Sequence, residues 1–475
     1  MVQLGQSTVH DWEALRGSIA GEVILPGSPD YESARKPAIT RFHDSRPLAV
    51  VACETTEDVS ETISFARRSG LGATTRSGGH CFSGRSSTGE IVIDVSPMRS
   101  VSVSGGVATV GAGARLGDVY DALDGHGITI PAGCGPSVGI SGLTLGGGMG
   151  ILGRKHGLTS DHLLGAQVVL ADGRTVECDG HNEQDLFWAL RGAGGCNFGV
   201  VTSLIFGTVL APDATAFHLM WPHAYAAAIV SAWQVWSPAA PADLTAGLRV
   251  FAPDDPGLSP FVSVFGVMLG PESEAGHLLE ELVARTGVDP SSAVLEHASY
   301  REIKHYLAEH GLGDHRPDGH QFSKSEFFRR PLPEETVAAL VENLSEKRMP
   351  GESRELDFTP WAGAYNRVPA EATAFAHRDE RFLLLQVAVV DADASTAERE
   401  AARGWLYRSW TSVHPWGSGG VYPNFPDPDL GDWAHAYHGT NLERLVHLKR
   451  KYNPDGFFRF HQSIPCCLLG DSPPE

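Results

Sequence analysis

The chain has 475 residues, and its 37 Lys and Arg against 57 Asp and Glu give a formal net charge of −20. This acidic balance argues against nucleic acid or an anionic membrane as the main partner, because both favour clustered Lys and Arg. Hydrophobic residues make up 42% of the chain and charged residues 20%, which excludes a disordered or fibrous protein. Glycine is enriched, with 54 residues, and the excess is concentrated in a few segments.

The cysteines and the N-terminal residues favour a soluble, reduced protein. The seven cysteines are an odd number and widely spaced, and residues 1–17 lack the basic and apolar regions of a secretory signal. No apolar run approaches the roughly 18 residues of a membrane span. We therefore expect a cytoplasmic monomer or homodimer that acts on a small molecule and has no membrane or nucleic-acid partner.

Residues 1–206 form the first predicted domain and alternate short apolar runs with turns. Strands are predicted at 48–52, 89–95, 107–110, 167–170 and 174–178, the last two joined as a hairpin by the Asp172-Gly173 turn. A helix is predicted over 56–69, where apolar residues recur at helical spacing between a Thr55 or Thr56 cap and Gly70.

Residues 207–415 form a second predicted domain, in which glycine is sparse and tryptophan is concentrated. Helices are predicted at 273–285 and 333–347, and strands at 261–269 and 381–390. The tryptophans either pack in the core or line an aromatic substrate pocket. Residues 416–475 begin with a bend rich in Pro and Gly and continue into a helix predicted over 441–452.

Four motifs suggest other functions, and each lacks the context that its function needs. Residues 111–117 resemble a nicotinamide-dinucleotide turn without the acidic residue that should follow, and residues 148–153 match G-x-G-x-x-G without a preceding strand. Residues 135–139 match the hydrolase motif G-x-S-x-G, but glycine and proline interrupt the strand that should lead into it. His305, His310, His315 and His320 are spaced by five, which turns successive side chains by about 140° on a helix, so we expect a surface loop and no metal site.

Three glycine clusters carry the strongest signal. They are Thr75-Arg-Ser-Gly-Gly-His-Cys-Phe-Ser-Gly84, the segment 131–150, in which eight of twenty residues are Gly, and Gly192-Ala-Gly-Gly-Cys-Asn-Phe-Gly199. Consecutive glycines let backbone N–H groups surround a pyrophosphate without a lysine. Three such clusters around one extended ligand indicate a large dinucleotide.

Four segments together identify a family. The loop 76–84, GGGMGILGRKHGL at 146–158, DLFWALRGAGGCNFGVV at 185–201 and YNPDGFFRFHQSI at 452–464 closely resemble the berberine-bridge-enzyme-like flavoproteins of the vanillyl-alcohol-oxidase, or PCMH-type, FAD superfamily. The resemblance covers about residues 40–206 and 416–465. The segment between them is similar only in its general residue pattern. The resemblance implies an α+β fold in which a split FAD-binding domain, 1–206 and 416–475, encloses an inserted α/β substrate domain with an antiparallel sheet covered by helices.

The resemblance also implies FAD as the cofactor and a set of residues that contact it. These are His80, Cys134, Arg76, Ser77, Gly78, Gly79, Phe82, Ser83, Gly84, Gly133, Ser137, Gly139, Gly142, Thr144, Gly147, Gly148, Gly150, Asn197, Gly199, Val200, Val201, Tyr422 and Asn424. In this family a histidine at the position of His80 is bonded to the flavin 8α-methyl group. Many members add a bond from a cysteine to flavin C6, and Cys134 lies in that neighbourhood, although Gly135 and Pro136 make its loop one residue longer than usual.

The proton acceptor departs from the family pattern. The family's alcohol oxidases carry Tyr-x-Asn-Tyr-x-Asp, in which the second Tyr deprotonates the substrate hydroxyl, whereas this chain has Tyr422-Pro-Asn-Phe425-Pro-Asp427. Phe425 has no proton to exchange, so the sugar-oxidase mechanism does not carry over. Tyr422 is expected to keep a role in the flavin pocket, and Tyr365 is an alternative acid or base.

The resemblance therefore predicts an FAD-dependent oxidase that takes a hydride from a small organic substrate and passes electrons to O₂. Bacterial relatives often tailor secondary metabolites, which makes a late biosynthetic intermediate the favoured substrate class. Two alternatives stay open: a carbohydrate or oligosaccharide oxidase of the same fold, and a flavin-binding protein that acts as a non-redox cyclase or binding protein.

Overall fold

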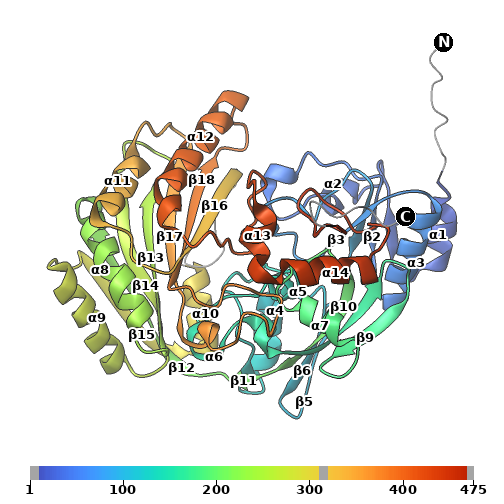
Figure 1. Ribbon diagram of the computed structural model, residues 1–475, viewed down its shortest axis with the longest axis horizontal. Coiled ribbons are helices and arrows are strands. Elements are labelled where there is room, and N and C mark those ends of the chain that lie inside the picture. The colour runs from blue at the N-terminus through green and yellow to red at the C-terminus, as the bar shows by residue number, and fades with distance from the viewer. Residues whose placement is uncertain (1–9, 310–318, 468–475) are drawn as a thin grey trace.

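The computed structural model describes residues 10–309 and 319–467 and has an α+β architecture with two lobes (Figure 1). The first lobe holds the sheets built from residues 22–210, and the second holds a seven-stranded sheet built from residues 213–390. The C-terminal helices α13 (Trp433–His438) and α14 (Leu442–Tyr452) return to the first lobe, where α14 packs against α7 (Gln184–Leu190). The predicted α+β fold is confirmed, and the boundaries at 206 and 415 remain predictions.

Two main sheets form the first lobe. One has the order β1 (Glu22–Ile24), β2 (Ala49–Ala52), β4 (Ile91–Asp94) and β3 (Ala73–Arg76), and the other has the order β5 (Val101–Ser104), β6 (Val107–Gly111), β10 (Gly199–Gly207), β8 (Leu163–Leu170) and β9 (Thr175–Asp179). A short pair joins β7 (Ile128–Thr129) to β11 (Val209–Leu210). The other helices of this lobe are α1 (Trp12–Ser18), α2 (Tyr31–Ala34), α3 (Thr56–Arg68), α4 (Leu116–Asp124), α5 (Ile140–Leu145) and α6 (Gly153–His156). Because β2 and β3 both run parallel to β4, the loop after β3 begins at the edge of the sheet where these strands end.

Local sequence signals explain the elements that were predicted in this lobe. Helix α3 begins at a capping box, in which the Thr55 side chain accepts a hydrogen bond from the Asp58 N–H and the Asp58 carboxylate accepts one from the Thr55 N–H. Strands β8 and β9 pair as the predicted hairpin, and Gly173 takes the positive φ of +86° that its turn requires.

The second lobe is one antiparallel sheet covered on its outer face by helices (Figure 1). The strand order is β15 (Ser292–Ser299), β12 (Asp213–Pro222), β14 (Phe261–Met268), β13 (Leu244–Ala252), β17 (Glu352–Pro360), β18 (Phe382–Val390) and β16 (His320–Phe328). The covering helices are α8 (Ala226–Ala239), α9 (Glu272–Thr286), α11 (Glu334–Ser345) and α12 (Thr396–Val413). Trp221, Trp233 and Trp405 are buried in the core between sheet and helices, so these tryptophans serve packing.

The two described ends of the histidine-rich segment lie in regular structure, and the surface loop predicted between them falls on residues outside the described ones. Helix α10 (Tyr300–Glu309) contains His305, and β16 begins at the buried His320, whereas His310 and His315 lie outside the described residues. Apolar residues of α10, Ile303 and Leu307, are buried, which explains why this segment is helical. Across residues 10–309 and 319–467, no helix is both long and apolar enough to cross a membrane.

A buried histidine joins the large sheet to the returning C-terminal segment. His377 stacks on Phe327 of β16 with ring centroids 4.9 Å apart, and its Nε2 lies 3.1 Å from the carbonyl oxygen of Tyr437 in α13. Burial lowers the pKa of His377 to about 4. The ring is therefore neutral in the folded protein at neutral pH and donates its N–H to that carbonyl.

This burial predicts a loss of stability in mild acid. An unfolded chain takes up a proton at this histidine below its ordinary pKa of about 6.5, and the folded chain does so only near 4, so the free energy of unfolding falls as the pH drops through that window. Between pH 7 and pH 5 the contribution is about 2 kcal/mol. Urea titrations should show that His377→Gln loses less stability over this interval than the wild type, with His126→Gln as the exposed control. An unchanged pH dependence in His377→Gln would contradict the assignment.

Candidate active site

A large cavity lies between the two lobes, and its empty space is about 2090 Å³ when the part open to solvent is included. Its walls come from the loop after β3, the loop before α5, strand β10, the C-terminal segment near Tyr422 and the inner face of the large sheet. Because its walls extend from the glycine loops of the first lobe to the large sheet of the second, the cavity can take an extended ligand.

The loop after β3 and the loop before α5 touch through two glycines. A Cβ atom at Gly78 would overlap the backbone nitrogen of Gly139, and a Cβ atom at Gly139 would overlap that of Gly78. Ser77 Oγ and Ser141 Oγ donate hydrogen bonds to the same carbonyl, that of Ala112, at 2.8 and 2.7 Å. Both loops are thus anchored at one point of the first lobe.

Arg76 determines where the first of these loops begins. Its guanidinium pairs with the Asp94 carboxylate at 3.0 Å and donates to the carbonyl of Arg35 at 3.1 Å. The side chain is only 4% exposed. Arg76 lines the cavity, as predicted, but its donors bind protein groups, so it positions the loop.

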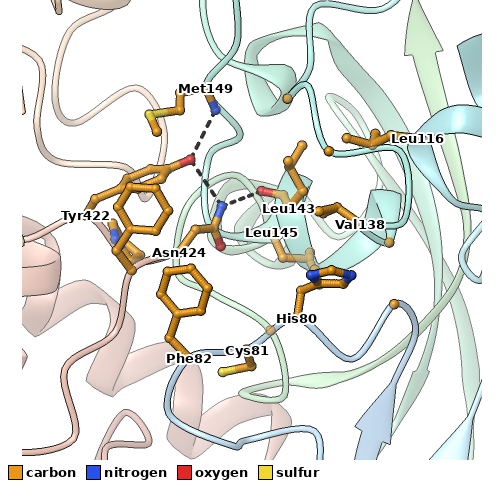
Figure 2. A pocket seen from close by; sticks show the side chains of 18 of the residues that line it. His80, Cys81, Phe82, Leu116, Val138, Leu143, Leu145, Met149, Tyr422 and Asn424 are labelled. Atoms are coloured by element: carbon orange, nitrogen blue, oxygen red, sulfur yellow. Dashed lines mark hydrogen bonds between the residues drawn. The ribbon is translucent and has the colours of Figure 1, made fainter. Parts of the chain in front are cut away.

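His80 and Cys134 reach the cavity from these two loops. The Nε2 atom of His80 lies 3.1 Å from Ser137 Oγ, which orients the imidazole. Both His80 and Cys134 are half-buried, and Figure 2 shows the His80 ring beside Val138 and Leu145 in the cavity wall. The imidazole of His80 and the thiol of Cys134 thus line the same cavity.

The glycine run 146–153 serves packing more than ligand contact. A Cβ atom at Gly146 would overlap the Asn424 side chain, and one at Gly153 would overlap the Tyr365 hydroxyl. Within this run, Met149, Gly150 and Ile151 line the cavity, whereas Gly147 and Gly148 do not. Those two adopt positive φ angles of +111° and +83°, which explains why they are glycine.

Tyr422 and Asn424 hold this run against the C-terminal segment (Figure 2). The Tyr422 hydroxyl accepts hydrogen bonds from the N–H groups of Gly148 and Met149 at 3.0 and 3.1 Å, and from Asn424 Nδ2 at 3.2 Å. Burial raises the pKa of Tyr422, and the three donors oppose the shift. The phenol is therefore neutral at pH 7.

Tyr365 is placed away from the cavity. It lies in a short 3₁₀ helix (Gly363–Asn366), is 1% exposed, and its hydroxyl donates to the carbonyl of Gly150 at 3.1 Å. Its aromatic ring stacks on Trp361 with centroids 4.3 Å apart. Because the hydroxyl is enclosed by protein and burial raises its pKa, the acid or base role expected for Tyr365 lacks access to a substrate.

The inner face of the large sheet supplies the opposite wall. Alternate residues of β13, Thr245, Gly247 and Arg249, face the cavity, because the intervening residues are buried under the outer helices. Arg249 is the cross-strand partner of Asp357 in β17, with Nη2 and Oδ2 3.9 Å apart. Among the described residues that line the cavity, Asp357 is the only one with a carboxylate. The wall formed by the large sheet therefore carries the acidic group of the cavity.

Phe425 forms part of an apolar wall between these groups and the glycine loops. Its ring is stacked on Phe82 with centroids 5.5 Å apart and an interplanar angle of 8°, and it meets Tyr422 edge-on at 5.0 Å. The residue in the position of the family tyrosine thus contributes an aromatic face and no exchangeable proton.

Most of the predicted cofactor residues line the cavity. They are Arg76, Ser77, Gly78, Gly79, His80, Phe82, Gly133, Cys134, Gly139, Gly142, Gly150, Gly199, Val200, Val201, Tyr422 and Asn424. Ser83, Gly84, Ser137, Thr144, Gly147, Gly148 and Asn197 are not among the lining residues. Thr144 and Asn197 bond to backbone within the protein, and Ser83 and Gly84 face a second, smaller cavity. Whether each lining residue touches the cofactor remains a prediction.

Sequence reasoning missed the residues that reach the cavity from the large sheet and from α10. Thr245, Arg249, Phe265, Asp357 and Leu307 carry no motif. The alternation of apolar and polar residues in 244–252 indicates a one-sided strand, but only the register of the sheet shows which residues meet across it. Among the described residues, no group of three His, Cys, Asp or Glu side chains is arranged to hold a metal ion.

Comparisons with known proteins agree with this geometry. Residues 47–179 match the family model of the FAD binding domain, and residues 421–465 match that of berberine and berberine-like proteins. The uncharacterized FAD-linked oxidoreductase YgaK of Bacillus subtilis is 32% identical over 456 residues, which cover 94% of this chain and 97% of that protein. This chain belongs to the berberine-bridge-enzyme-like FAD-linked oxidoreductases.

Solved structures of this family superpose over nearly the whole chain. The berberine-bridge-enzyme-like protein 1 of Physcomitrella patens has a TM-score of 0.85 at 27% identity and covers 96% of this chain and 98% of its own. Glucooligosaccharide oxidase from Acremonium strictum, described with a 6-S-cysteinyl, 8α-N1-histidyl FAD, has a TM-score of 0.84 at 26% identity and covers 95% and 99%. This enzyme of the berberine-bridge-enzyme-like family is therefore an FAD-dependent oxidoreductase.

The cavity fits the cofactor that the family uses. Residues of all three glycine clusters line it, and the backbone wall at Gly78 and Gly139 has no room for side chains. His80 and Cys134 place two nucleophilic groups along the same space. FAD in a berberine-bridge-enzyme-like protein supplies a hydride acceptor, and these residues are those that would hold it.

The contact between Gly78 and Gly139 predicts a specific loss of cofactor. Gly78→Ala must separate the two loops, and overpacking of this kind costs about 1–3 kcal/mol. We expect the ratio of FAD to protein, measured from the visible absorbance of purified enzyme, to fall to about a tenth of the wild-type value. Gly89→Ala is the matched control, because a Cβ atom there meets nothing within 4 Å. Full flavin content in Gly78→Ala would contradict the predicted role of this contact.

Proposed function

We propose that this enzyme is an oxidase whose FAD is bonded to both His80 and Cys134, and that it oxidises a small organic substrate with O₂ as electron acceptor. The observation that supports the proposal is that an imidazole and a thiol from two touching loops line one cavity. The flavin supplies the hydride acceptor when bound. The two bonds have a precedent in the 6-S-cysteinyl, 8α-N1-histidyl FAD of glucooligosaccharide oxidase.

In this proposal the protein's residues position the reactants and keep water out. Phe82 and Phe425 form an apolar wall, and Tyr422 keeps the Gly148–Met149 backbone in place while its neutral hydroxyl is occupied by three donors. The proton of the substrate is expected to leave toward the polar face of the sheet, where Asp357 faces Arg249.

The favoured substrate is an intermediate of secondary metabolism, by resemblance to bacterial members of the family. Phe425, which replaces the tyrosine expected in the family's alcohol oxidases, argues against a carbohydrate. An oligosaccharide oxidase remains the second candidate, supported by the similarity to glucooligosaccharide oxidase. The protein is proposed to act in the cytoplasm as a monomer or homodimer.

The covalent attachment predicts that colour stays with the protein. After precipitation with trichloroacetic acid, the pellet of the wild-type enzyme should remain yellow, because neither bond is broken by unfolding. His80→Ala and Cys134→Ala should each retain one bond, and the double variant should release all flavin to the supernatant. Mass spectrometry of tryptic peptides assigns each bond. Colourless wild-type pellets would refute covalent attachment.

The oxidase activity predicts flavin reduction and peroxide release in the same reaction. Under anaerobic conditions a true substrate should bleach the flavin absorbance, and admission of air should restore it with one hydrogen peroxide per substrate oxidised. Cellobiose and chitobiose test the carbohydrate alternative, and aromatic or amine-bearing alcohols test the favoured class. Product formation without any bleaching would show a non-redox reaction and overturn the proposal.

A further inference from the structure

One buried lysine has a position that the proposed reaction does not yet explain. Lys304 lies on α10, in the chain between β15 and β16, and is 6% exposed. Its ammonium reaches the loop of the first lobe that carries Cys134. There it donates to the carbonyl of Gly133 at 2.9 Å and lies 3.8 Å from Cys134 Sγ.

Among the described residues, the side chains around this ammonium are aromatic apart from Cys134, and none is a carboxylate. The Nζ atom of Lys304 lies 4.4 Å from the ring centroid of Tyr120 and 5.3 Å from that of Tyr300, and it contacts the Tyr120 hydroxyl at 3.2 Å. Among residues 10–309 and 319–467, no Asp or Glu forms an ion pair with Lys304. A buried ammonium without an anionic partner is costly. The site therefore favours a nearby group that can ionise to an anion.

Three titratable side chains face Lys304, and two of them are unsuited to that role. Burial raises the pKa of Tyr120 and of Tyr300 well above its ordinary value, so both phenols stay neutral. Cys134 is the third and lies at the edge of the cavity. Burial lowers the pKa of Lys304, and the hydrogen bond from its ammonium to Cys134 Sγ acts in the opposite direction.

We propose that Lys304 is a positioning residue that holds Cys134 as a thiolate aimed at the cavity, ready to bond to the flavin; this inference rests on the second bond proposed above. In forming that bond, sulfur replaces hydrogen at flavin C6. The thiolate contributes the electron pair of the new C–S bond, the C6 hydrogen leaves as a proton, and two electrons pass to O₂, which becomes hydrogen peroxide. The positive charge of the lysine stabilises the thiolate, and the lysine is not consumed in the reaction.

The geometry also explains how the thiol stays directed. Tyr120 donates its hydroxyl hydrogen to the carbonyl of Gly133 at 2.6 Å, and Lys304 donates to the same oxygen. The carbonyl of Ala132 is a further acceptor for the ammonium, at 3.3 Å. Residues on both sides of the interface between the lobes therefore fix the backbone immediately before Cys134.

The experiment follows formation of the bond in time. The full-length protein is expressed and purified without oxygen, supplied with FAD, and then exposed to air at pH 7.5 or pH 9.5. Mass spectrometry of peptides measures the Cys134–flavin and the His80–flavin bonds separately. The variants are Lys304→Met, Lys304→Gln, Lys304→Arg, and Arg301→Met as a control on the exposed side of the same helix.

At pH 7.5 the Cys134 bond should form about tenfold or more slowly in Lys304→Met and Lys304→Gln. Lys304→Arg, which keeps a cation, and Arg301→Met should remain within about threefold of the wild type. At pH 9.5 thiolate forms without help, so the neutral variants should approach the wild-type rate. The His80 bond should form at the wild-type rate in every variant, which reports correct folding and FAD binding.

Two results would overturn the inference: a wild-type rate of Cys134 bonding in both neutral variants at pH 7.5, or an equal slowing at both pH values. If the wild-type enzyme never bonds Cys134, the second flavin bond in the proposed function is wrong. Lys304 is then judged by alkylation of Cys134 with iodoacetamide at pH 7.5. That reaction should be about tenfold slower in Lys304→Met, and an unchanged rate would refute the role of the lysine.

Discussion

The close approach of two backbone segments at Gly78 and Gly139 determines how this enzyme can hold its cofactor. Neither residue can carry a Cβ atom without overlap, so the two loops meet main chain to main chain. His80 follows Gly78 by two residues, and Cys134 precedes Gly139 by five. Their separation across the cavity is therefore set by a contact that side chains do not adjust. A rigid backbone contact suits a site that must hold one cofactor in one orientation.

The glycine excess has two physical origins. At Gly78 and Gly139 the missing side chains allow loops to touch, but at Gly146 and Gly153 they leave room for Asn424 and the Tyr365 hydroxyl. The second group of glycines lets the C-terminal segment and the segment after β17 pack onto the first lobe. The expectation that all three clusters cradle FAD remains a prediction, and Gly146 and Gly153 have a packing role besides. Part of the family motif therefore serves packing onto the first lobe.

Local sequence signals made much of the fold predictable. Features that depend on contacts between distant residues could not be predicted. The Thr55 capping box and the Asp172-Gly173 turn act within a few residues, so helix α3 and the β8–β9 hairpin could be inferred. The positions of Arg249 and Asp357 depend on the register of β13 and β17, which are a hundred residues apart. The acid or base role expected for Tyr365 depended on where its side chain points. A motif shows the neighbourhood of a side chain and not its direction. Lys304 was missed because helix α10 has no glycine motif and begins just before the histidine repeat.

The two walls of the cavity differ in how readily they can change. The wall formed by the glycine loops is main chain and glycine, so most substitutions there would move backbone. The opposite wall is a set of side chains on alternate positions of β13 and β17, whose backbone is fixed by antiparallel pairing and by a helix-covered core. A side chain on such a strand can be exchanged without displacing its neighbours. Phe425 stacks on Phe82 and brings no hydroxyl to the cavity. In the proposed function, a change of substrate class therefore requires only a few side chains on the sheet and at Phe425, with the glycine loops left intact.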